Sequence, residues 1–198
     1  MREMKTGILI PDNQKIISTE ELKKWGFTHY KINKLVDEGN LIKLNKKNYE
    51  NANFKGEDSD FYFVHAYAST GVVCLMSAAV FYNLSTYRPD AIDVAVSKKK
   101  NVSTLPDWPS FNLYYFEKDR FQTGVQIIKE GPNQFQIYDI EKTVVDIIYY
   151  RNKIGIEETK EILMNYLNRN DRDINKLYRY AEQLKCSDIL RTYLEVLI

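Results

Sequence analysis

The spacing of apolar and polar positions divides the first fifty residues into two short helices and a hairpin. Ser18 is followed three residues later by Glu21, the spacing of a capping box in which each side chain bonds the other's backbone amide. We expect a short helix after Ser18, ended by Gly26. A second helix is expected from Thr28, which suits an N-cap, to about Glu38.

The second helix has a single apolar face. Ile32, Leu35 and Val36 recur at the i, i+3, i+4 spacing that turns side chains toward a core, and Gly39 suits the C-terminal cap. Residues 41–49 place an apolar stretch, a polar tip and a tyrosine in order, which predicts a β-hairpin. Two helices joined by a Gly-containing turn, then a hairpin, form the winged helix-turn-helix pattern.

Beyond a polar linker at 51–59, a block of strands precedes a block of helices. The expected strands are 72–76, 92–97, 111–116, 125–129 and 135–138. The expected helices are 60–68, 77–84 with Ser77 as N-cap, 140–150, 157–168, 174–185 and 188–197. This order predicts an α+β fold with a mixed β-sheet and helices rather than alternating α/β. We therefore expect two domains, a winged helix-turn-helix DNA-binding domain at 1–50 and an α+β domain at 58–198.

Composition limits the class of protein. A hydrophobic fraction of 44% supports a packed core and argues against disorder. Cys74 and Cys186 are too few for a disulfide framework, so we expect reduced thiols in a cytoplasmic protein. No apolar run approaches the roughly 20 residues of a membrane span, so no membrane partner is expected.

Charge is distributed unevenly along the chain. The net charge is +1, with +4 up to Lys55 and −3 in the remainder. A basic small domain beside a mildly acidic larger one is consistent with DNA binding at one end.

The polar side chains of the second helix would point away from the core, and the start of such a helix enters the major groove. Lys31 and Lys34 can meet phosphates or guanine edges, and Asn33 can read adenine. The free amides at the helix start favour a phosphate. The alternative is an exposed helix face that is merely solvated. The candidate DNA-contacting residues are Thr28, His29, Tyr30, Lys31, Asn33, Lys34, Lys46 and Lys47.

Catalytic signals are weak. His29 and His65 are the only histidines, and we find neither clustered metal ligands nor a nucleotide-binding motif. Asp90 and Asp93 leave open a Mg²⁺-dependent nucleic-acid-processing enzyme, but the strand lacks the second acid or acidic-x-Lys that such sites use. We expect no enzyme, no cofactor and no metal site.

A short basic run, Lys98–Lys100 followed by Asn101, lies after the strand expected at 92–97. A solvated loop is the simpler interpretation of this run. A second contact with DNA or with a partner is the alternative.

Three stretches resemble one known family in their order and spacing. They are the helices and hairpin of 18–49, the helix and strand of 77–96, and the Glu-Lys-Thr-x-x-Asp helix start from Glu141 to Asp146. In these stretches the chain resembles the AbiEi family of antitoxins from type IV toxin–antitoxin systems. The N-terminus is shorter than expected, and the wing reads Lys-Lys-Asn-Tyr at 46–49 where Arg-Gly-hydrophobic-Tyr is expected.

The resemblance implies a function. Such proteins repress their own operon through the winged helix, on inverted repeats, which implies a homodimer on operator DNA. The second domain counteracts a cognate nucleotidyltransferase toxin without needing to bind it directly. A non-enzymatic protein-interaction adaptor is the remaining alternative.

The helix start at Glu141 also has an explanation from the residues alone. Asp139 as N-cap and Glu141 in the first turn complement the helix dipole. We therefore favour a structural role for Asp146 over a catalytic one.

Overall fold

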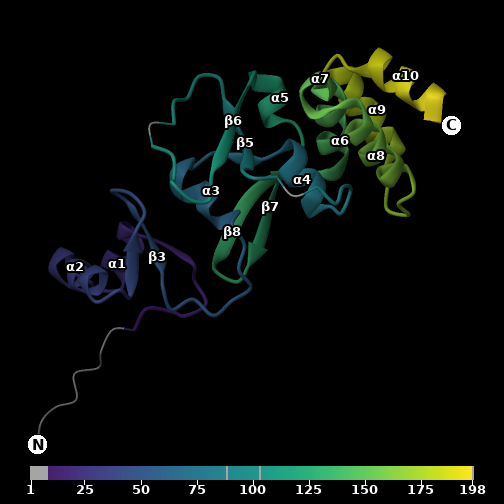
Figure 1. Ribbon diagram of the computed structural model, residues 1–198. Coiled ribbons are helices and arrows are strands. Elements are labelled where there is room, and N and C mark those ends of the chain that lie inside the picture. The colour runs from purple at the N-terminus through teal and green to yellow at the C-terminus, as the bar shows by residue number, and fades with distance from the viewer. Residues whose placement is uncertain (1–8, 88, 103, 198) are drawn as a thin grey trace, which may run out of the picture. The chain divides into compact units, whose positions relative to one another are not determined.

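The computed structural model describes residues 9–87, 89–102 and 104–197, whose elements are labelled in Figure 1. The fold is α+β, as predicted. The chain forms two compact units. The first unit contains the described residues up to 69 together with 129–134, and the second contains 70–128 and the described residues from 135 onward.

Among its described residues up to 69, the first unit contains three short strands and three helices. Its elements are β1 (Ile16–Ser18), α1 (Thr19–Lys24), α2 (His29–Asp37), β2 (Leu41–Lys43), β3 (Asn48–Asn51) and α3 (Tyr62–Tyr67). The strands form an antiparallel sheet in the order β1-β3-β2, with Tyr49 opposite both Ile17 and Lys43. The two helices and the hairpin lie where the sequence predicted them, whereas β1 was missed because three residues are too few to show alternation.

Local capping signals explain where α1 and α2 begin. Ser18 and Glu21 form the predicted capping box, and the Thr28 hydroxyl accepts a hydrogen bond from the Lys31 amide. Gly26 and Gly39 both have positive φ, at 88° and 75°, which ends the helices as expected. The first unit's apolar core, which fixes the orientation of α2, consists of Ile17, Leu22, Phe27, Ile32, Leu41 and Tyr49.

The first unit is larger than the domain expected at 1–50. The side chain of Asn133, at the start of a strand far along the chain, accepts a hydrogen bond from the Lys15 amide at 2.7 Å and donates one to the Asn13 carbonyl at 2.9 Å. These bonds, and those between α3 and the β2–β3 hairpin, join residues far apart along the chain. The polar composition of 51–59, which predicted the domain boundary, carries no information about them.

The second unit is built around a mixed sheet and a group of helices. Its strands are β4 (Val72–Val73), β5 (Ile92–Ser97), β6 (Phe111–Phe116), β7 (Val125–Glu130) and β8 (Asn133–Tyr138), although the turn between the last two belongs to the first unit. The order is β6-β5-β4-β8-β7. Strand β4 pairs antiparallel with β5 and parallel with β8, and β5 pairs parallel with β6.

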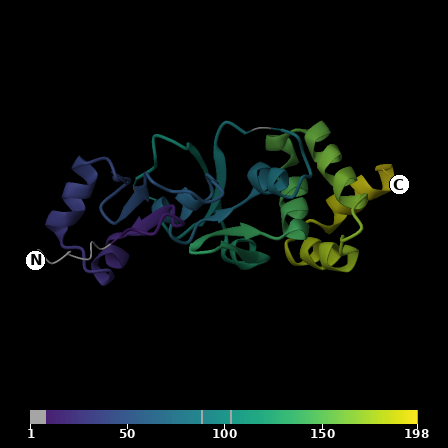
Figure 2. The same cartoon turned by 90° about the horizontal axis from the view of Figure 1, so that it is seen from below.

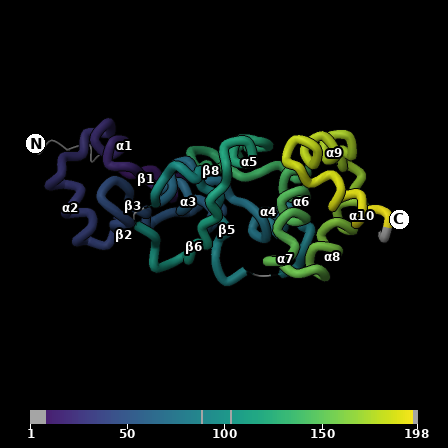
Figure 3. Tube along the Cα trace, turned by 90° about the horizontal axis from the view of Figure 1, so that it is seen from above, coloured from purple at the N-terminus to yellow at the C-terminus, as the bar shows by residue number. Residues whose placement is uncertain are grey.

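The helices of the second unit gather around α6, which contacts α4, α8, α9 and α10. Figures 2 and 3 show the green to yellow helices α6 to α10 in two further views. The helices of this unit are α4 (Leu75–Phe81), α5 (Lys118–Gln122), α6 (Ile140–Tyr149), α7 (Arg151–Ile154), α8 (Ile156–Leu167), α9 (Ile174–Gln183) and α10 (Ser187–Leu197). The short helices α5 and α7 were not predicted, and neither has a side-chain N-cap.

The prediction that Ser77 caps a helix after a strand at 72–76 was wrong. Strand β4 ends at Val73, Cys74 is the N-cap residue, and Ser77 lies within α4. The capping group comes from β5, because the Asp93 carboxylate accepts a hydrogen bond from the Met76 amide at 3.1 Å. The Ser77 hydroxyl in turn accepts one from the Asp93 amide at 2.9 Å.

Candidate nucleic-acid interface

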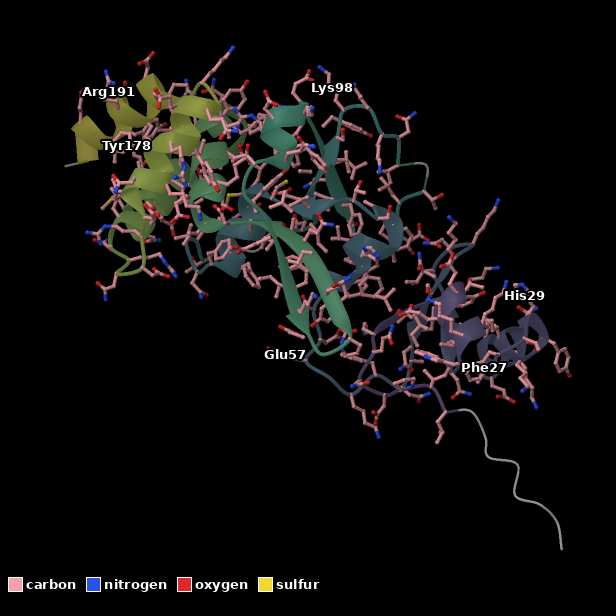
Figure 4. All side chains as sticks on the ribbon, turned by 180° about the vertical axis from the view of Figure 1, so that it is seen from behind. Phe27, His29, Glu57, Lys98, Tyr178 and Arg191 are labelled. Carbon is pink, nitrogen blue, oxygen red and sulfur yellow. The ribbon has the colours of Figure 1, made fainter. Side chains whose placement is uncertain are left out.

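The outward face of α2 is the candidate interface. Ile32 is buried with 1% of its surface exposed, so the helix is fixed by its apolar side. Figure 4 labels the exposed His29, the first residue of α2, and the buried Phe27, which precedes the N-cap Thr28. All the residues predicted to contact DNA from this helix are exposed, namely Thr28, His29, Tyr30, Lys31, Asn33 and Lys34.

Charge on this face is only weakly neutralised. Lys34 forms an ion pair with Glu38 across one helical turn, at 3.6 Å, and its side chain is 63% exposed. Exposed pairs of this kind contribute about 0–1 kcal/mol, so the Lys34 ammonium can leave Glu38 for a phosphate at little cost. Tyr30, which directly precedes Lys31 in the helix, is 78% exposed.

The hairpin between β2 and β3 supplies the other predicted contacts. Lys46 and Lys47 at its tip are both exposed. The backbone around them is held from within the first unit, since the Thr19 amide donates to the Lys47 carbonyl at 2.7 Å. The side chains of Asn45 and Asn48 both donate to the Ala66 carbonyl in α3, each at 2.9 Å. The sequence predicted α3 but carried no signal that it supports the wing.

The two acids of the enzyme alternative differ in burial. Asp93 is buried, with both carboxylate oxygens occupied by protein donors, the Met76 amide and the Asn112 side chain. Burial raises the pKa of Asp93, although these hydrogen bonds oppose the shift. Asp90 is exposed. Among the described residues, no group of three or more His, Cys, Asp or Glu side chains could hold a metal ion.

The basic run after β5 is partly engaged by its own unit. Lys98 forms an ion pair with Glu117 at 2.5 Å, and Lys100 donates to the Thr70 hydroxyl at 3.4 Å. Lys98 and Glu117 are both exposed, so their ion pair, like that of Lys34, holds the lysine only weakly, and the role of this run stays a prediction.

The Glu-Lys-Thr-x-x-Asp motif lies inside the second unit. Asp146 is fully buried and pairs with both Lys142, one turn earlier, and Arg120 of α5, the latter at 2.5 Å. Burial lowers the pKa of Lys142, while the Asp146 carboxylate favours its charged form. Glu141 accepts from the Tyr166 hydroxyl at 3.2 Å and pairs with Lys176 at 2.9 Å.

The motif thus lies in the buried interior of the second unit, and Asp139 is the N-cap of α6 as predicted. The sequence did not predict the contribution of Arg120, whose guanidinium also lies over the Tyr149 ring at 3.8 Å from its centroid.

Comparisons with known proteins do not assign the chain to a family. No protein-family model and no curated protein matches the chain. Among solved structures, the crystal structure of the RV2827C protein from Mycobacterium tuberculosis is similar, with a TM-score of 0.49 and 13% sequence identity. That similarity covers 93% of this chain and 76% of the other. None of the helices described for this chain is both long enough and apolar enough to cross a membrane.

Proposed function

We propose that this protein is an operator-binding repressor that reads DNA with α2. The observation that carries the proposal is the outward face of α2, where Lys31, Asn33 and Lys34 are exposed on a helix held by the Thr28 cap and the buried Ile32. Phosphate contacts by the lysines would supply affinity, and Asn33 with the lysines would read base edges.

The likeness to AbiEi antitoxins extends this proposal. The protein would repress its own toxin–antitoxin operon as a homodimer on inverted repeats, and the second unit would counteract a cognate nucleotidyltransferase toxin. Its place of action would be the cytoplasm, which also suits Cys74 and Cys186, both free and buried thiols. Restored growth of cells that express the nucleotidyltransferase together with this chain would support the antitoxin role, and unrelieved toxicity would contradict it.

Fluorescence-anisotropy titration with the protein's own upstream DNA tests the repressor role. The variant is Lys31→Ala combined with Lys34→Ala, measured over a salt series and against a scrambled duplex. We expect selective binding by the wild type, and a log K against log salt slope that falls by about 0.9 for each phosphate that the variant no longer neutralises. Removing a side chain that bonds a base edge should cost about 1–3 kcal/mol of discrimination.

The matched control is Lys118→Ala combined with Lys153→Ala, two exposed lysines of the second unit. This control makes the same change in net charge, so it separates a local contact from general attraction to DNA. Equal binding by the wild type and the α2 variant would refute the assignment of α2 as the reading helix.

A further inference from the structure

The tip of the β2–β3 hairpin, residues 44–47, is anchored at two sides by the first unit. On one side, the amide and hydroxyl of Thr19 both donate to the Lys47 carbonyl, at 2.7 and 3.0 Å. On the other side, the side-chain amides of Asn45 and Asn48 both donate to the Ala66 carbonyl near the end of α3. The Tyr67 hydroxyl also donates to the Leu44 carbonyl at 3.2 Å.

These bonds connect groups that the hairpin alone would leave to water. The last carbonyls of a helix have no partner within it, and Ala66 supplies one of them to two asparagine amides. The Asn45 side-chain oxygen meanwhile accepts from the amides of Lys47 and Asn48, at 2.9 and 3.0 Å, and so shapes the turn. A short loop that carries two exposed lysines is thereby held in one conformation.

We propose that Asn48 and Tyr67 are positioning residues for DNA binding, which fix the wing so that Lys46 and Lys47 meet the phosphate backbone without further ordering. This inference rests on the proposed function. A loop that is ordered only on binding loses conformational entropy at that step, and a loop ordered beforehand does not. The clamp formed by Asn48 and Tyr67 would thus raise affinity without touching DNA.

A double-mutant cycle tests this positioning role. Asn48→Ala combined with Tyr67→Phe removes two of the bonds to α3 and the 3.4 Å bond from the Asn48 side chain to Asn45. It leaves the Asn45 side chain, which accepts from the amides of Lys47 and Asn48 and so shapes the turn. The same pair of substitutions is made in the wild type and in a Lys46→Ala, Lys47→Ala background, and binding to the upstream DNA is measured by anisotropy over a salt series. Tyr67→Phe alone is the milder variant if the pair folds poorly.

In the wild-type background we expect the clamp variant to bind about three- to tenfold more weakly, the range for removing one or two ordinary hydrogen bonds. Its salt slope should fall toward that of the Lys46→Ala, Lys47→Ala protein. In the background without these lysines, the clamp substitutions should change affinity by less than about twofold. A purely structural defect would weaken binding equally in both backgrounds and would leave the slope unchanged.

The matched control is Asn53→Ala combined with Tyr180→Phe. Asn53 donates to the Asn40 side chain and Tyr180 to Asp139, so the control removes two hydrogen bonds away from the hairpin tip. This control should leave both affinity and slope as in the wild type.

Three results would overturn the positioning role. They are an equal loss of affinity in both backgrounds, no loss in the wild-type background, and full affinity of the Lys46→Ala, Lys47→Ala protein. Each of these leaves the proposed function standing if Lys31→Ala with Lys34→Ala still weakens binding. Absence of any binding by the wild type would instead refute the proposed function, and the inference with it.

Discussion

Helices α2 and α6 are similar in length and begin in the same way, but they use their polar residues in opposite directions. The Thr28 side chain accepts from the amide three residues on, and so does that of Asp139. In α2 the charged residues are exposed around one buried isoleucine, whereas in α6 Glu141, Lys142 and Asp146 are themselves buried.

The difference separates polar residues that are bonded within the fold from those that face solvent. Among the described residues, no buried side-chain nitrogen or oxygen lacks a hydrogen-bond partner, so the polar groups of α6 are satisfied from within. The outward residues of α2 need no such internal partners, because water solvates them until a ligand replaces it. A conspicuous motif such as Glu-Lys-Thr-x-x-Asp can therefore be buried in the core, while the face proposed to bind DNA has a plainer sequence.

The largest effect should come from the buried charges of α6. We expect Asp146→Ala to lower the free energy of unfolding by about 3–5 kcal/mol, because Lys142 and Arg120 would be left as buried charges without their carboxylate. Urea denaturation of the full chain measures this loss. Glu161→Ala, at an exposed position of α8, should change stability by less than about 0.5 kcal/mol. Equal stabilities of the two variants would contradict the structural role of the motif.

The two faces of α2 should respond in opposite ways. Ile32→Ala should cost about 2–5 kcal/mol of stability, since it removes a fully packed side chain from the first unit's core. Asn33→Ala should leave the free energy of unfolding within about 0.5 kcal/mol of the wild type. If Asn33 reads DNA, its replacement should weaken binding to the upstream duplex and reduce preference over a scrambled one. Urea denaturation and DNA-binding anisotropy on both variants show whether the buried face determines stability and the exposed face determines binding.

The sequence alone predicted those helices and strands that are determined by residues close to them along the chain. The capping box of Ser18 and Glu21 and the cap at Thr28 are confirmed, as are the strands 92–97 and 111–116. Each depends on neighbours along the chain or on clear alternation. The eight candidate DNA contacts are exposed as expected, although their role stays a prediction.

What the sequence could not show depends on partners far along the chain. Arg120 reaches Asp146 across 26 positions, and Asn133 reaches the Lys15 amide across 118. Asp93 caps α4 from another strand, which is why Ser77 was mistaken for the cap. Nothing local to 44–48 indicates that α3 supports the wing, because asparagine in a turn commonly bonds its own backbone.

The two acids of the enzyme alternative should also differ from each other. Asp93→Ala should destabilise the protein by about 1–3 kcal/mol, because the buried Met76 amide loses its acceptor. Asp90→Ala, at an exposed position, should have little effect on urea denaturation. Mg²⁺-dependent nucleic-acid turnover that disappears in Asp93→Ala, with the fold retained, would favour an enzyme over the structural role.

The smallest effect lies at the start of α1 and depends on pH. Burial acts to raise the pKa of Glu21, but hydrogen bonds from the Ser18 amide and hydroxyl and from Gln14 outweigh it and lower the pKa below the ordinary 4.5. A carboxylate whose pKa is lowered by folding stabilises the folded state fully above pH 4.5, and this contribution disappears as the pH falls through the folded-state value. Glu21→Gln keeps the size of the side chain but cannot ionise. We therefore expect the wild type to be the more stable by a small margin at neutral pH, and the margin to shrink below pH 4.5. Urea midpoints of both proteins between about pH 3 and pH 7 would show this, and a margin independent of pH would mean that the charge of Glu21 contributes nothing to the cap.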